Sequence, residues 1–240
     1  MPKLYGWQHI TYIVVCMVVI VTALVLAKKY LKSEKSQTIF VRCVGALLLV
    51  AIVTNRFSIA LKTTPAEWTY LLPDSLCGMS SLVLALATLF GKKDNHVFHF
   101  VWLISLIGGT AVTFYSNFIG QAPSFLYLPT ISGFLHHTLE AATVVVLFLF
   151  GWLHPTFKKW YCVLFGMISY IAMGAFFITV LGYHDAFDLI NPVLPGTPFT
   201  AWVMAPMYFA LDALIILCME CVRRRKSKHT SQNTTEEVSQ

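Results

Sequence analysis

The chain of 240 residues is 57% hydrophobic and only 12% charged, with a mean hydropathy of +0.70. Soluble domains carry about 25% charged residues, so this composition excludes a water-facing globular enzyme, a disordered chain and a disulfide-stapled secreted miniprotein. The net charge of +6 lies mainly in short connections between apolar runs. Charge in such connections orients a membrane protein during insertion, and we therefore expect no nucleic-acid partner.

Seven apolar runs follow one another along the chain, each about as long as a bilayer crossing requires. They predict an all-α, polytopic membrane helical bundle of about seven transmembrane helices. The expected ranges are 8–28, 39–61, 70–90, 97–116, 127–152, 161–183 and 199–221. We expect residues 1–221 to form one transmembrane domain, and the basic, then polar segment 222–240 to form a disordered cytoplasmic tail.

The basic residues divide unevenly between alternate connections. All 17 Lys and Arg residues except Lys3, Arg56 and Lys62 lie after the first, third, fifth and seventh runs or at the start of the second. Cytoplasmic connections carry the excess of positive charge. We therefore expect the amino terminus outside and the carboxyl terminus in the cytoplasm, and the short loops suggest a bacterial plasma membrane.

Several polar side chains interrupt the apolar runs. Such groups are costly in lipid and mark functional sites, unless they only join helices by hydrogen bonds. The topology places one set of them in the outer half of the bundle: Arg56, Asp74, Cys77, Tyr115, Asn117, His136, His137 and Glu140. In a helix that begins near Tyr70, Cys77 would lie about seven residues, or roughly 10 Å, below the outer surface.

The chemistry of this set favours acyl transfer. A thiol becomes a nucleophile when a neighbouring imidazole takes its proton. His136 and His137 share the expected depth of Cys77, and Glu140 follows them on the same helix face, where its carboxylate can orient either ring. Asp74, three residues before Cys77, is expected on the face of the thiol. A polar network that only joins helices is the alternative.

Polar residues outside this set have other interpretations. His96 and His99 have an i,i+3 spacing that could ligate a metal, but a solvated helix end is favoured, and we expect no metal and no cofactor. His9 could join the outer cluster or lie at the membrane interface. Asp212, deep in the seventh run, would line a pathway in a small-solute transporter or channel, which is the alternative function.

Three segments, GWQHI, LLPDSLCGMSS and FLHHTLE, resemble the YwaF-type bacterial integral membrane proteins, a family related to eukaryotic transmembrane protein 164. In the second segment a leucine-proline pair is followed by a leucine and then Cys77, as in the family pattern. The resemblance implies a lipid acyltransferase in which Cys77 accepts a fatty acyl chain from a phospholipid and His136 or His137 is the general base. A lysophospholipid would be the acceptor.

Two adjacent histidines stand where the bacterial relatives have serine-histidine, which favours His137 as the base. In this mechanism Arg56 is expected to hold the phosphate, with Tyr115 or Asn117 as further hydrogen-bond donors. The fold is also similar to the androgen-induced-gene hydrolases of fatty-acid esters, which use threonine and histidine. Hydrolysis, with water in place of the acceptor, therefore remains an alternative to transfer.

Overall fold

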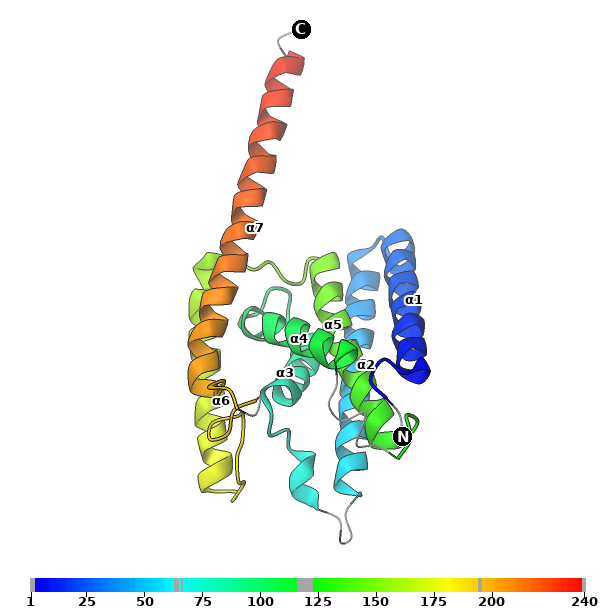
Figure 1. Ribbon diagram of the computed structural model, residues 1–240. Coiled ribbons are helices and arrows are strands. Elements are labelled where there is room, and N and C mark those ends of the chain that lie inside the picture. The colour runs from blue at the N-terminus through cyan, green and yellow to red at the C-terminus, as the bar shows by residue number, and fades with distance from the viewer. Residues whose placement is uncertain (1–2, 63–64, 66, 116–122, 194–195, 239–240) are drawn as a thin grey trace.

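A computed structural model describes residues 3–62, 65, 67–115, 123–193 and 196–238, with side chains up to Arg224. These residues fold into seven α-helices, as predicted, and the all-α class is confirmed (Figure 1). The helices are α1 (Trp7–Tyr30), α2 (Glu34–Ala60), α3 (Leu76–Phe90), α4 (His96–Phe114), α5 (Leu128–Leu149), α6 (Trp160–Thr179) and α7 (Ala201–Val238), with the 3-10 helices η1 (Trp68–Leu71) and η3 (Phe157–Lys159).

Within the described part of the chain, six helices are long and apolar enough to cross a bilayer, and α3 is the shorter exception. The protein is therefore an integral, multi-pass membrane protein. Helix α7 continues to Val238, through the segment predicted to be a disordered tail. The orientation of the termini and the division of the chain at residue 221 remain predictions.

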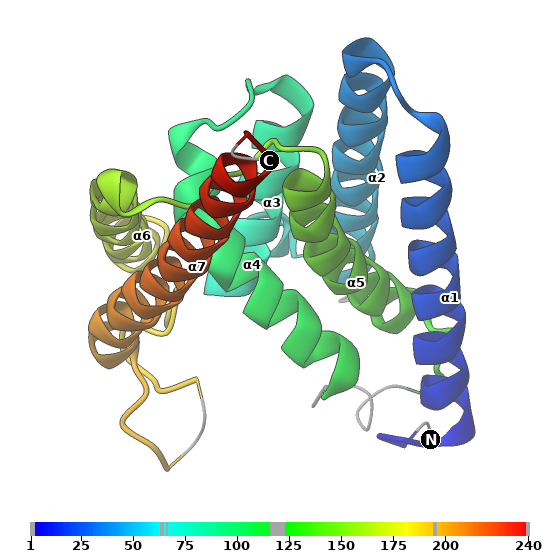
Figure 2. The ribbon, with the colours of Figure 1, turned by 90° about the horizontal axis from the view of Figure 1, so that it is seen from above.

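Four helices, α2, α3, α4 and α5, form the centre of the bundle, because α5 packs against α2 and α4 while α3 packs against the same two helices. Helix α1 lies on one side against α5, and α6 and α7 lie on the other side (Figure 2). In the apolar stretch of α5 61% of residues are buried, against 6% in α1. Helix α1 is thus mostly exposed to lipid, whereas α5 is mostly buried in the bundle.

Helix α1 is attached to the centre by a small polar network. The buried ring of His9 accepts a hydrogen bond at Nδ1 from the backbone N–H of Tyr5, so its Nε2 donates to the carbonyl of Thr113, 3.0 Å away. One turn further, the hydroxyl of Tyr12 meets that of Thr138 at 2.9 Å. His9 therefore has both ring nitrogens satisfied and joins helices rather than the outer cluster.

The largest departure from the predicted elements concerns α3, which begins at Leu76 and not near Tyr70. Pro73 has no N–H to continue a helix, and Ser75 caps α3 by accepting a hydrogen bond at its hydroxyl from the N–H of Gly78. The expectation that Asp74 shares a helix face with Cys77 is therefore wrong. Cys77 lies instead in the first turn of a helix.

Candidate functional site

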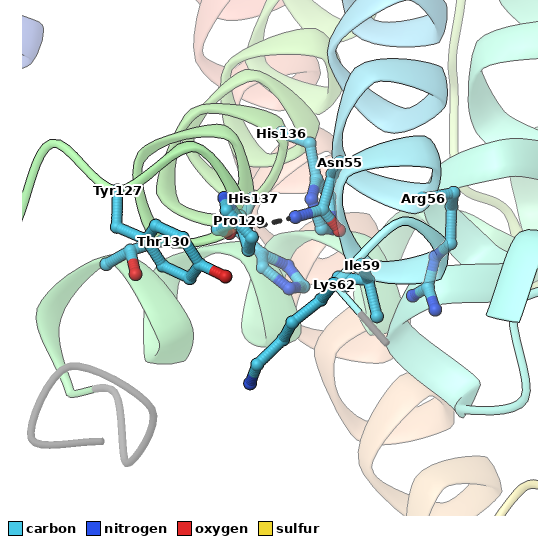
Figure 3. Close-up of a pocket in the computed structure, with 10 residues that line it drawn as sticks. Asn55, Arg56, Ile59, Lys62, Tyr127, Pro129, Thr130, His136 and His137 are labelled. Carbon is cyan, nitrogen blue, oxygen red and sulfur yellow. Dashed lines mark hydrogen bonds between the residues drawn. The ribbon is translucent and has the colours of Figure 1, made fainter. Parts of the chain in front are cut away.

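A pocket of about 330 Å³ opens between the end of α2 and the beginning of α5 (Figure 3). We call this side of the bundle the pocket end; it is the lower end in Figure 1. Two cations, two histidines and several polar side chains contribute to its wall. The lining residues are Asn55, Arg56, Ile59, Lys62, Tyr127, Pro129, Thr130, Gly133, His136 and His137. Arg56 and both predicted histidines thus meet in one cavity.

The two histidines lie side by side on α5, with ring centroids 3.9 Å apart. Nδ1 of His137 is 3.1 Å from Oε2 of Glu140, one turn further along the helix. When Glu140 is ionised its carboxylate only accepts hydrogen bonds, so in that state Nδ1 carries the proton and Nε2 of His137 is a lone-pair base. His136 has no such partner: it is 3% exposed, and among the described residues its Nδ1 forms no hydrogen bond.

Glu140 is fully buried at the junction of three helices. Besides His137, it interacts with the hydroxyls of Ser81 on α3 and Ser105 on α4. These two contacts are loose, because Oε1 of Glu140 and the hydroxyl of Ser105 lack a hydrogen-bond partner among the described residues. Leaving such buried polar atoms unpaired costs about 1–3 kcal/mol each. A fold can tolerate this cost where hydrogen bonds must change during a reaction.

Two glycines on α4 bring the thiol and the histidines to one level of the bundle. A Cβ on Gly108 would lie 2.8 Å from Sγ of Cys77, and a Cβ on Gly109 would lie 2.5 Å from the carbonyl oxygen of His137. Any side chain at either position would collide with a neighbour. Cys77 and the backbone of His137 therefore contact α4 at two consecutive residues.

The directions of α3 and α5 give the order of these residues along each helix. The hydroxyl of Ser81 donates to the carbonyl of Cys77, so Cys77 lies one turn closer to the pocket end than Ser81. On α5, His137 lies one turn closer to that end than Glu140. Ser81 and Glu140 interact with each other, and from this pair Cys77 and His137 each lie one turn toward the beginning of their own helix.

Arg56 links the pocket to the first turn of α3. Its Nη1 is 4.0 Å from Oδ1 of Asp74, and its Nη2 lies 2.7 Å from the position of a Cβ on Gly78, the residue after Cys77. The side chain of Arg56 is only 14% exposed. The guanidinium group thus lies between the cavity and the segment that carries the thiol.

The connection between α6 and α7 folds back over the start of α3. The buried ring of Phe187 stacks on Tyr170, and its backbone N–H donates to the carbonyl of Asp74. Phe187 and Asp188 both have φ near 56°, a strained backbone that the burial of the ring offsets. Burial, and then the charges of Asp185 and Asp74, raise the pKa of Asp188 to about 6.

Of the eight predicted site residues, Arg56, His136 and His137 line the pocket. Asp74 and Glu140 approach its wall residues from outside the lining, and Cys77 lies next to Gly78 without lining the pocket.

The other two predicted site residues do not join this group. Tyr115 ends α4 with its side chain 61% exposed, and it is not among the described residues that line the pocket. Asn117 lies outside the described residues. Conversely, sequence reasoning missed Lys62, Tyr127 and Thr130 as pocket residues; the only available signal was their expected position at the outer ends of helices.

The opposite end of the bundle holds a second polar cluster. His99 is buried, with Nε2 2.8 Å from Oδ1 of Asp94, and Nζ of Lys159 is 2.6 Å from Oδ2 of the same carboxylate. The ring of His96 meets the hydroxyl of Tyr161 at 3.0 Å. The expectation of a solvated helix end is therefore wrong for His99. Among the described residues, no group of three or more His, Cys, Asp or Glu side chains could hold a metal ion.

Asp94 is the centre of that cluster. Partial burial raises the pKa of Asp94, but hydrogen bonds from Lys159 and His99 outweigh this effect and hold that pKa below its usual range. The backbone N–H of His154 donates to the same carboxylate, at 3.2 Å. The cluster thus joins the α3–α4 connection to the α5–α6 connection.

Comparison with known proteins identifies one relationship. The family model described as "TMEM164 family" matches residues 4–222, nearly the whole membrane-embedded part of the chain. No curated protein and no solved structure gives a significant match. The match includes every residue of the pocket and the first turn of α3.

Proposed function

This chain belongs to the TMEM164 family, and from that premise we propose that it is a membrane-embedded lipid acyltransferase with Cys77 as nucleophile and His137 as general base. The observation that carries the proposal is the contact of Cys77 and His137 with two consecutive glycines of α4. The pairing of His137 with Glu140 supports it, because a carboxylate that holds Nδ1–H leaves Nε2 free to accept a proton.

The proposed reaction has two half-reactions. In the first, Nε2 of His137 takes the thiol proton and Sγ of Cys77 attacks the ester carbonyl of a phospholipid. The ester C–O bond breaks, the lysophospholipid leaves with the proton from the imidazolium, and the acyl chain remains on sulfur as a thioester. In the second, His137 removes the proton from the hydroxyl of an acceptor lysophospholipid, whose oxygen attacks the thioester and releases the thiol.

The position of Cys77 in the first turn of α3 supports this role. The first N–H groups of a helix have no partner within the helix and carry partial positive charge, which favours a thiolate and an oxyanion. Ser75 already occupies the N–H of Gly78. We propose that the earlier N–H groups of this turn, with Arg56 beside them, stabilise the tetrahedral oxyanion.

His136 is proposed to have a different role from His137. It lines the same pocket as His137, but among the described residues no carboxylate pairs with its ring. We assign it to the pocket wall, where its ring packs against that of His137 and limits the movement of the base. His137, rather than His136, is therefore the proposed base.

Replacement of the nucleophile tests the proposal. In proteoliposomes with a labelled phospholipid donor and a lysophospholipid acceptor, we expect Cys77→Ala to lower acyl transfer by about 10³-fold or more. We also expect hydroxylamine-sensitive labelling of the protein by the acyl chain to disappear. The matched control is Cys43→Ala, which removes an exposed thiol of α2.

Three other outcomes would contradict the proposal. Full acyl transfer by a well-folded Cys77→Ala protein would show that Cys77 is not the nucleophile. Product formation that does not depend on the acceptor would identify a hydrolase. Solute flux that survives the substitution, in a protein without acyl transfer, would favour the transporter or channel.

A further inference from the structure

The charge of the α2–α5 pocket is one-sided. Arg56 and Lys62 contribute to its wall, and none of its described lining residues is Asp or Glu. Two carboxylates approach the wall from outside the lining: Oε2 of Glu140 is 3.1 Å from Nδ1 of His137, and Oδ1 of Asp74 is 4.0 Å from Nη1 of Arg56. A cavity with two cations and no acidic wall residue attracts an anion.

Arg56 has more hydrogen-bonding capacity than its described neighbours use. A guanidinium group carries five N–H donors in a planar fork, yet its ion pair with Asp74 is long, at 4.0 Å, and the Asp74 side chain is 41% exposed. The hydroxyl of the nearby Tyr183 donates to the carbonyl of Thr69 and not to a partner of Arg56. A largely buried arginine with such a weak partner is suited to a bidentate anion such as phosphate.

Helix α5 adds a second contribution. The pocket wall includes Pro129 and Thr130, in the first turn of this 22-residue helix, so the positive end of the helix dipole faces the cavity. Asn55 has a mechanical role instead: its Nδ2 donates to the carbonyl of Pro129 and to the hydroxyl of Ser132. Asn55 thus holds the two walls of the pocket together.

We propose that the α2–α5 pocket binds the phosphate of a glycerophospholipid whose headgroup carries no cation, as in phosphatidylglycerol, and that Lys62 determines this preference. The assignment rests on the proposed acyl transfer for its biological meaning, but the binding can be measured without it. A choline or ethanolamine headgroup would bring a positive charge towards Lys62, whereas a glycerol headgroup would not.

The same geometry relates the headgroup to the reaction. Arg56 faces the pocket while its Nη2 lies against Gly78, next to Cys77. Phosphate and acyl esters are attached to one glycerol, so a phosphate held by Arg56 leaves an ester within reach of the first turn of α3. Arg56 would therefore position the substrate, and Lys62 would select it.

Direct lipid binding tests the assignment without catalysis. Full-length Cys77→Ala protein in detergent is mixed with equal amounts of phosphatidylglycerol and phosphatidylcholine with identical acyl chains, and retained lipid is counted by native mass spectrometry. We expect phosphatidylglycerol to be retained about fivefold more, as for an exposed ion pair worth about 1 kcal/mol. Adding Lys62→Gln should remove this preference, and the matched control Lys29→Gln, on the exposed last turn of α1, should leave it unchanged.

Each result has a distinct meaning. Equal retention of the two lipids, or equal loss with Lys62→Gln and Lys29→Gln, would overturn the assignment. Displacement of the lipid by inorganic phosphate at the same concentration would identify a site for free phosphate and would also overturn it. Selective retention in a protein whose Cys77-containing form transfers no acyl chain would support the headgroup site and refute the proposed function.

Discussion

The two ends of the bundle are built from the same kinds of residue but are bonded differently. At the opposite end, the imidazole of His99 and the ammonium group of Lys159 both bond to Asp94, at 2.8 and 2.6 Å. At the pocket end, the imidazole of His137 bonds to Glu140 at 3.1 Å, and the second oxygen of that carboxylate has no described partner. The Asp94 cluster is thus saturated, in the sense that both oxygens of its carboxylate are bonded, whereas the Glu140 cluster is not.

This difference separates a structural cluster from a candidate catalytic one. A saturated ion pair joins two connections and gains nothing from a ligand. Unpaired donors and acceptors beside a cavity keep capacity for a substrate, although they cost free energy of folding. Residue type and spacing alone do not make this distinction, because both clusters contain a histidine and a carboxylate close together in sequence.

Replacing one histidine at each end tests this distinction between the two clusters most directly. We expect His137→Ala to lower the rate of acyl transfer per folded molecule by about 10²–10⁴-fold, the usual contribution of a general base, in addition to the cost of leaving the buried Glu140 carboxylate unpaired. We expect His99→Ala to leave the rate per folded molecule unchanged and to cost about 1–3 kcal/mol of stability, because buried partners lose a hydrogen bond. Assays in proteoliposomes and thermal unfolding in detergent measure the two effects; a reversed pattern would show that the assignment of the ends is wrong.

A smaller effect is expected at Glu140, which orients the base without touching the substrate. Glu140→Gln keeps the size of the side chain and an oxygen that can accept from His137, but it removes the charge that stabilises an imidazolium. We expect kcat to fall by about 10²-fold with KM nearly unchanged, and the pH profile of kcat to shift. An unchanged pH profile together with lower stability would assign Glu140 a purely structural role.

The smallest effect concerns Asp94 at the saturated end. Its pKa in the folded protein is below its usual range, so its contribution to stability is present above the pKa of the unfolded chain, about 3.9, and is lost as the pH falls through the folded value. We expect Asp94→Asn to cost about 1 kcal/mol at pH 7, since a side chain that is 37% exposed is partly screened by solvent. The variant should also lose less stability than the parent when the pH is lowered below 4; equal acid sensitivity would contradict the ion pair.

Much of the fold could be predicted from sequence because lipid leaves few solutions. A chain with long apolar runs must satisfy its backbone within helices, and the seven helices and the common depth of Arg56, His136 and His137 follow from that constraint. The contact between His137 and Glu140 is likewise local, since residues three apart on a helix are neighbours.

What sequence reasoning missed depends on distant partners or on caps. The saturation of the Asp94 carboxylate comes in part from Lys159, which is 65 residues away in sequence, at the end of η3. The late start of α3 depends on Ser75 as an N-cap, a signal present in the sequence but outweighed there by the apolar residues on both sides. The burial of Phe187 against Tyr170 follows from how α6 and its following connection pack, which no periodicity encodes.

The shortness of α3 determines what must surround the chain just before it. Its 15 residues rise about 22 Å, less than the roughly 30 Å thickness of a hydrocarbon core. The chain just before it is not α-helical, and such backbone is tolerated at that depth only against protein or a wetted cavity. That protein is the α6–α7 connection, because the backbone N–H of Phe187 donates to the carbonyl of Asp74, just before α3. A thioester formed on Cys77 would therefore lie beneath this connection, and the fit of the connection would set how often water reaches the acyl chain before an acceptor arrives.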